Sequence, residues 1–110
     1  MAEDLEKKLL KGVAYRMFVE EMQKHLLAAE AFFESGQWTA ETLKEMSGRF
    51  HTIRGGAGFF KLVEIASLAG ELEKGLIAGE ASDVAAKAQS FRDIYENLRG
   101  AAAKAPQPAS

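Results

Sequence analysis

The sequence contains no cysteine and only two prolines among its 110 residues. Without cysteine, neither a disulfide framework nor a thiolate metal site can form, which fits a reducing compartment. The formal net charge of −2, with both signs interspersed, lacks the basic excess that a nucleic-acid or membrane surface needs, so we expect neither partner. The opening MAEDLEKKLL is charged throughout, unlike a secretory signal, and no apolar run reaches membrane-spanning length. These absences predict a cytoplasmic protein.

Apolar residues at helical spacing fill four successive segments, and no run alternates as a half-buried strand does. The predicted core stripes comprise Tyr15, Val19, Met22, Leu26, Ala29 and Phe33; Leu43, Met46, Phe50, Ile53, Ala57 and Phe60; Ile65, Leu68, Leu72 and Leu76; and Val84, Ala88, Phe91, Tyr95 and Leu98. Short connections between the segments favour antiparallel neighbours. The sequence therefore predicts one all-α domain, an antiparallel up-down-up-down four-helix bundle. We expect a monomer, because the four stripes can cover one another.

Residues that cap or stop helices separate these segments. The expected boundaries lie at Gly36, Thr39, Gly79, Ser82 or Asp83, and Gly100. Residues 3–11 predict a possible short extra N-terminal helix that covers one end of the bundle. After Gly100, the sequence AAAKAPQPAS contains alanine and proline without periodicity. We therefore expect the bundle over residues 1–100 and a flexible Ala/Pro tail or linker over residues 101–110.

Glycine is concentrated beside a histidine in RFHTIRGGAGFF, residues 49–60. Each glycine costs about 1 kcal/mol relative to alanine inside a helix, so one interpretation is a turn that ends the second helix near Ile53. The core stripe nevertheless continues in phase through Phe60, which favours a continuous helix. On that helix, the residues that share the face of His51 are Ser47, Gly48, Arg54, Gly55 and Gly58. We expect His51 to be exposed there, opposite the core stripe and above a bare strip of backbone.

An exposed imidazole with a cation one helical turn away points to phosphoryl chemistry. Imidazole is a competent nucleophile, and phosphoryl transfer requires mainly positioning and charge stabilisation. Arg54 can pair with phosphoryl oxygens, and Lys44 and Lys61 can contribute charge from farther away. The alternative is that His51 is an ordinary surface histidine.

Residues 51–58, HTIRGGAG, closely resemble the histidine phosphotransfer (HPt) motif, His-x-x-(Lys/Arg)-Gly followed by small residues. The likeness covers roughly residues 12–99 and is greatest to the amino-terminal phosphotransfer domain of chemotaxis-type histidine kinases. The resemblance implies that His51 is phosphorylated and exchanges the phosphoryl group with an aspartate of a response-regulator receiver domain. It also implies a histidine kinase as a partner, no catalytic machinery or cofactor of its own, and Mg²⁺ supplied with the receiver.

A second match lies in residues 68–73, LAGELE, which resemble Leu-Ala-His-x-Leu-Glu of the chemotaxis-type branch. Glu73 falls at the position of a glutamate that hydrogen-bonds the other ring nitrogen of the reactive histidine, so the resemblance implies that it orients His51. The alternative for Glu73 is a solvated carboxylate on a helix face. Gly70 replaces the auxiliary histidine of that branch, and Lys61 stands near a position where glycine is common.

The surface that flanks His51 is the expected contact for a receiver. Its predicted partner-binding residues are Lys44, Ser47, Gly55, Gly58, Phe59 and Lys61. Phe59 has packing against the third helix as its alternative. The chain lacks the repeated Glu-x-x-His pairs of a bundle metal site, so we expect no metal. A non-phosphorylated docking module for a receiver or kinase is the alternative function, and either a free-standing shuttle or a domain of a larger kinase fits the sequence.

Overall fold

The computed structural model describes residues 2–106, with side chains described from residue 10 onward except at position 81. Within that range the chain forms five helices and no strand, which confirms the prediction of an all-helical protein. The helices are α1 (Ala2–Ser35), α2 (Ala40–Phe59), α3 (Val63–Ala78), α4 (Ala81–Ala86) and α5 (Ala88–Lys104).

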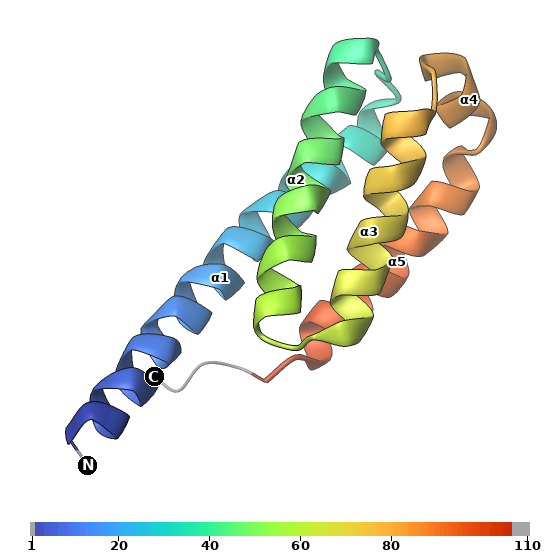
Figure 1. The fold of residues 1–110 in the computed structure, drawn as a ribbon. Coiled ribbons are helices and arrows are strands. Elements are labelled where there is room, and N and C mark those ends of the chain that lie inside the picture. Colours follow the sequence, from blue (N-terminus) through green and yellow to red (C-terminus); the bar gives the residue numbers. More distant parts are fainter. Residues whose placement is uncertain (1, 107–110) are drawn as a thin grey trace.

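The helices lie side by side along one direction (Figure 1). The chain rises along α1, descends along α2, rises along α3 and descends along α5, while the short α4 connects the last two. The most extensive packing is between α2 and α3, followed by α3 with α5 and α1 with α2. The N-terminal part of α1 extends past the other helices, so the molecule measures 56 Å by 21 Å by 19 Å.

The core combines the predicted stripes with three further buried apolar residues, Phe32, Ala69 and Ala101. Most stripe residues are buried, and Tyr15, Phe60, Leu68 and Ala88 are only partly buried. The hydroxyl of Tyr95 on α5 is buried and donates a 2.9 Å hydrogen bond to the Leu26 carbonyl on α1. Burying a tyrosine stabilises the fold only when its hydroxyl has such a partner.

The N-terminal segment differs from the expectation. Residues 3–11 form no separate helix, because α1 is continuous from Ala2 to Ser35. Gly12 is the one glycine in that helix, and it keeps helical geometry without a positive φ. A single glycine weakens a helix without ending it, so the extra piece is an extension of α1.

The C-terminal boundary at Gly100 is wrong, because α5 continues to Lys104. Ala101 is buried in the core, and alanine is the best helix former, so burial and propensity together carry the helix past the glycine. The predicted tail therefore does not begin at residue 101. Residues 107–110 lie outside the described residues, and the flexibility of the tail stays a prediction.

The fourth predicted helix is divided in two. Its first part, α4, begins after Glu80 rather than at Ser82 or Asp83, and the backbone N–H of Glu80 donates to the Asp83 carboxylate at 3.3 Å. Lys87 separates α4 from α5 and leaves helical geometry with a ψ of 15°. The apolar stripe continues across this break, since Val84 and Phe91 are both buried.

The ends of α2 are well defined, and they fix its position beside α3. At the start, Thr39 and Thr42 cap each other: each backbone N–H donates to the hydroxyl of the other residue, at 2.8 and 3.1 Å. At the end, Lys61 adopts a left-handed conformation with φ of 61°. The N–H of Leu62 donates to the Ala57 carbonyl at 2.8 Å, which is the pattern of a Schellman motif. This tight reversal starts α3 directly beside α2.

Candidate functional site

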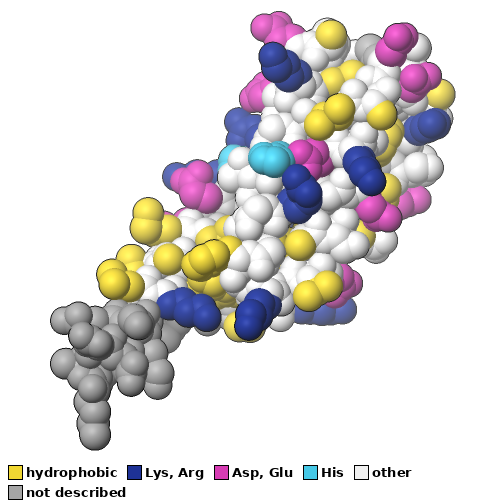
Figure 2. Space-filling model, viewed as in Figure 1, with side chains coloured by type: hydrophobic (Ala, Val, Ile, Leu, Met, Phe, Trp, Pro, Cys, Tyr) yellow, Lys and Arg dark blue, Asp and Glu magenta, His cyan; other side chains and the backbone are white. Residues whose placement is uncertain are grey.

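Helix α2 passes through the glycine-rich stretch without a break and ends at Phe59. The prediction of a continuous helix is therefore correct. His51 lies in its middle and is 64% exposed, as the phase of the core stripe predicted. On the face seen in Figure 2, histidine, acidic and basic side chains gather midway along α2 and α3.

The glycines of α2 fall into two groups. A Cβ atom at Gly48, Gly55 or Gly58 would meet no atom within 4 Å, so these three leave open space around His51. A Cβ atom at Gly56 would lie 2.4 Å from the ring of Phe18 on α1. Gly56 therefore serves the packing of α1 on α2, and only the other three form the bare strip.

Two charged side chains, Arg54 of α2 and Glu73 of α3, meet at His51. The Nδ1 atom of His51 lies 2.6 Å from Oε2 of Glu73. The other carboxylate oxygen of Glu73 lies 2.8 Å from Nε of Arg54, an ion pair between α3 and α2. A terminal guanidinium nitrogen of Arg54 also lies 3.1 Å from His51 Nδ1. Glu73 is only 13% exposed, so this ion pair is partly shielded from water.

The two neighbours of Nδ1 require opposite protonation states of that atom. A protonated Nδ1 donates to Glu73, whereas an unprotonated Nδ1 accepts from Arg54. A carboxylate at 2.6 Å would repel a ring lone pair, so the geometry favours a proton on Nδ1. In the neutral ring, Nε2 then carries the free lone pair. The arrangement presents a nucleophilic nitrogen on an exposed side chain.

A sequence model of the Hpt domain matches residues 13–101, which is most of the chain. The chain belongs to the Hpt domain family. Hpt domains are phosphocarrier modules rather than catalysts; they act in histidine phosphotransfer within two-component phosphorelays and interact with receiver domains and kinases. Searches of curated proteins and of solved structures give no significant match.

Most of the predicted contact residues of this Hpt domain are exposed. They are Lys44, Gly55, Gly58, Phe59 and Lys61. Phe59 is exposed and meets the ring of Phe60 edge-on, with centroids 4.9 Å apart, rather than being buried against α3. Ser47 is the exception. It is only 5% exposed, because it faces α3 near Leu76, and its hydroxyl donates to the Lys44 carbonyl at 2.8 Å. Ser47 therefore presents little surface to a partner.

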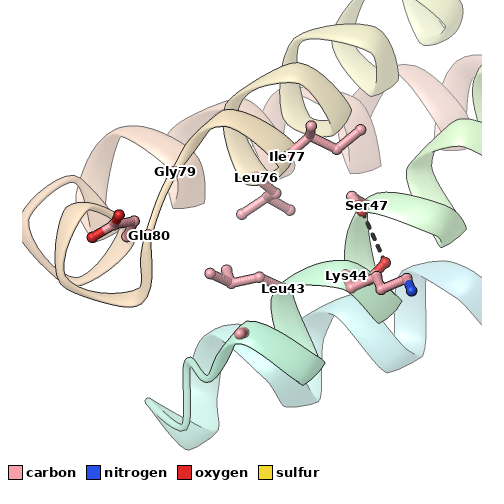
Figure 3. Close-up of a pocket in the computed structure, with 8 residues that line it drawn as sticks. Leu43, Lys44, Ser47, Leu76, Ile77, Gly79 and Glu80 are labelled. Carbon is pink, nitrogen blue, oxygen red and sulfur yellow. Dashed lines mark hydrogen bonds between the residues drawn. The ribbon is translucent and has the colours of Figure 1, made fainter.

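An open cleft of about 580 Å³ lies between the start of α2 and the end of α3 (Figure 3). Leu43 and Leu76 point toward each other across it, and Lys44 and Glu80 also line it. Ile77, which also lines the cleft, is 66% exposed and was not among the predicted contact residues. The missed signal is spacing, because Ile77 follows Glu73 by four residues and shares its helix face.

His25 is the second histidine, and it lies in α1. Its Nδ1 accepts a hydrogen bond from Arg49 on α2 at 3.2 Å. Partial burial, and then the charge of Arg49, lower the pKa of His25, while Glu21 acts in the opposite direction. No group of three or more metal-ligating side chains occurs in the part of the chain that the structure describes. Across those same residues, no helix is both long and apolar enough to span a membrane.

Proposed function

We propose that this Hpt domain carries a phosphoryl group on Nε2 of His51, between a histidine kinase or receiver and the aspartate of a response regulator. The contact of 2.6 Å between His51 Nδ1 and Glu73 supports this assignment most directly. A docking surface has no use for a partly shielded carboxylate on the ring nitrogen of an exposed histidine. A nucleophile does, because the carboxylate holds the proton on Nδ1 and so leaves the lone pair on the opposite, exposed nitrogen.

The transfer from a phosphorylated receiver is a displacement at phosphorus. The Nε2 lone pair attacks, the Nε2–P bond forms as the P–O bond to the aspartate breaks, and the aspartate leaves as a carboxylate. The Nδ1 proton stays on the ring, and Glu73 balances the positive charge that the ring acquires. The reverse displacement delivers the group to the next receiver.

Arg54 has two roles in this proposal: it holds Glu73, and it contacts the phosphoryl group. Its Nε holds Glu73 at 2.8 Å, and its terminal nitrogen cannot donate to a protonated Nδ1. That nitrogen is therefore available to phosphoryl oxygens once His51 is modified. The partner receiver supplies Mg²⁺ and the acidic pocket, and the domain contributes no cofactor.

The receiver docks over the α2 and α3 face in this proposal. Lys44, Gly55, Gly58, Phe59 and Lys61 border His51 along α2 and its C-terminal turn, and their exposure supports a contact role. The domain acts as a cytoplasmic monomer on an antiparallel scaffold of α1, α2, α3 and α5. The LAGELE stretch supports the chemotaxis-type branch, either as a shuttle or as part of a larger kinase.

The test is transfer from a phosphorylated receiver in the presence of Mg²⁺, read on a phosphate-affinity gel. The chain has two histidines, so His51→Gln is matched by His25→Gln. We expect an acid-labile label on the wild type and on His25→Gln, and none on His51→Gln. If the folded wild type binds receivers and kinases but accepts no label from any of them, the domain is a docking module.

A further inference from the structure

Gly70 in α3 faces the side chain that crosses from α2. A Cβ atom built at Gly70 would lie 3.2 Å from Cδ of Arg54, and no other atom of the surroundings would lie within 4 Å of it. The other glycine in the middle of α3, Gly75, has a different reason, because its Cβ would meet the ring of Phe91 at 2.4 Å. Core packing therefore explains Gly75 and does not explain Gly70.

The space above Gly70 is part of an open groove of about 660 Å³ on α3. Arg54, Gly70, Glu73 and Lys74 are among the residues that line it. Arg54 lies across this groove and reaches Glu73 with Nε at 2.8 Å. The aliphatic part of the Arg54 side chain rests where a residue with a side chain at position 70 would place its own atoms.

We infer that Gly70 is a positioning residue of the His51 site, because its missing side chain admits Arg54 across α3 to hold Glu73. This inference rests on the proposed function for its effect on transfer, but the placement of Arg54 can be tested without it. A larger side chain at position 70 removes the path of Arg54 while leaving all three site residues in the sequence. Glu73 then still contacts His51 but loses its ion pair with Arg54.

The dependence on side-chain size follows from the distance. At 3.2 Å, a methyl group requires Cδ of Arg54 to move by only a few tenths of an ångström, which a flexible side chain can do. We therefore expect Gly70→Ala to retain the Arg54–Glu73 pair and Gly70→Leu to break it. Both substitutions favour the helix, so we expect both variants to fold.

The experiment compares the wild type, Gly70→Ala, Gly70→Leu and Arg54→Ala, together with Gly70→Leu/Arg54→Ala. Gly100→Leu is the matched control, since Gly100 lies in α5 with open space around it. Nitrogen-15 NMR of the unphosphorylated protein reports the Nε–H resonance of Arg54 and the tautomer of His51. We expect Gly70→Leu to lose the slowly exchanging Arg54 resonance, and Gly70→Ala and Gly100→Leu to retain it.

The transfer rate supplies the second readout. We expect Gly70→Leu to transfer about tenfold more slowly, as for the loss of one charged contact at the site. We expect the substitution to have little further effect when Arg54 is already alanine. An unchanged Arg54 resonance in Gly70→Leu, or an equal loss of rate in the Arg54→Ala background, would overturn the inference. A wild type that accepts no label overturns the proposed function instead, and the NMR comparison still decides the role of Gly70.

Discussion

The ring of Phe18 on α1 occupies the space that a side chain at Gly56 on α2 would need. Two ring carbons lie 2.4 Å from the position of a Cβ atom there, closer than real contacts allow. Gly55, its neighbour in the sequence, faces open space. The two adjacent glycines thus have different structural roles. Gly56 lets α1 and α2 approach each other, and Gly55 leaves the surface beside His51 open.

This difference predicts opposite effects of alanine on stability. Gly55→Ala should raise the free energy of unfolding by about 1 kcal/mol, the helix propensity difference. Gly56→Ala gains the same propensity but overpacks Phe18, which costs about 1–3 kcal/mol, so we expect no gain or a net loss. Urea denaturation of both variants measures the difference. Equal stabilisation by the two substitutions would contradict the proposed packing role of Gly56.

Lys61 predicts a stabilising substitution. Its φ of 61° is unfavourable for a residue with a side chain and normal for glycine at the end of a helix. We expect Lys61→Gly to raise the free energy of unfolding by about 0.5–1 kcal/mol, because relief of strain exceeds the added freedom of the unfolded chain. Lys74→Gly, in the middle of α3, is the control and should lower it by about 1 kcal/mol. If both lysine substitutions destabilise the protein, the left-handed turn is not formed in solution.

Glu73→Gln tests the orientation of His51. The amide can still accept a hydrogen bond from Nδ1–H, but it loses the charge that pairs with Arg54 and with the modified ring. We expect phosphotransfer to slow by about tenfold, with more neutral ring in the other tautomer by nitrogen-15 NMR. Glu71→Gln removes an exposed carboxylate from the same helix and should match the wild type. Equal rates for the two variants would show that Glu73 does not orient His51.

His25 predicts how stability depends on pH. Its pKa in the folded state lies below the ordinary value of 6.5, owing to burial and Arg49, with Glu21 opposing. The unfolded chain therefore binds more protons in this range, so the contribution of His25 is present above about pH 6.5 and is lost as the pH falls through the folded-state pKa. Melting temperatures from about pH 8 to about pH 5 should fall more steeply for the wild type than for His25→Gln. Parallel curves would contradict the lowered pKa.

The sequence was sufficient for the course of α2 and the exposure of His51. Both follow from phase: Phe50, Ile53 and Ala57 stay on one face of a helix, so the glycines cannot interrupt it without exposing them. The position of Glu73 came from the resemblance of LAGELE. The apolar phase of α3 alone leaves Glu73 at the edge of the buried face, and its distance from His51 depends on how two helices are offset.

Other features depend on contacts between helices, which periodicity does not specify. Ser47 shares a helix face with His51, yet α3 covers it near Leu76. From the sequence alone, Gly70 is only the replacement of an auxiliary histidine. In the structure, the Arg54 side chain lies beside it, 3.2 Å from the position of a Cβ atom. The sequence also predicts too early an end for α5. Glycine commonly ends helices, but the burial of Ala101 carries α5 past Gly100 to Lys104.

The exposure of His51 also bears on how long a phosphoryl group would last. The described residues provide no wall on the outer side of the ring, since Gly48, Gly55 and Gly58 flank it on α2. A group held there would stand in bulk water, with a lifetime governed by the N–P bond and by the frequency of collisions with receivers. Signal strength would then depend on the cellular concentrations of the partners more than on any closure of the carrier.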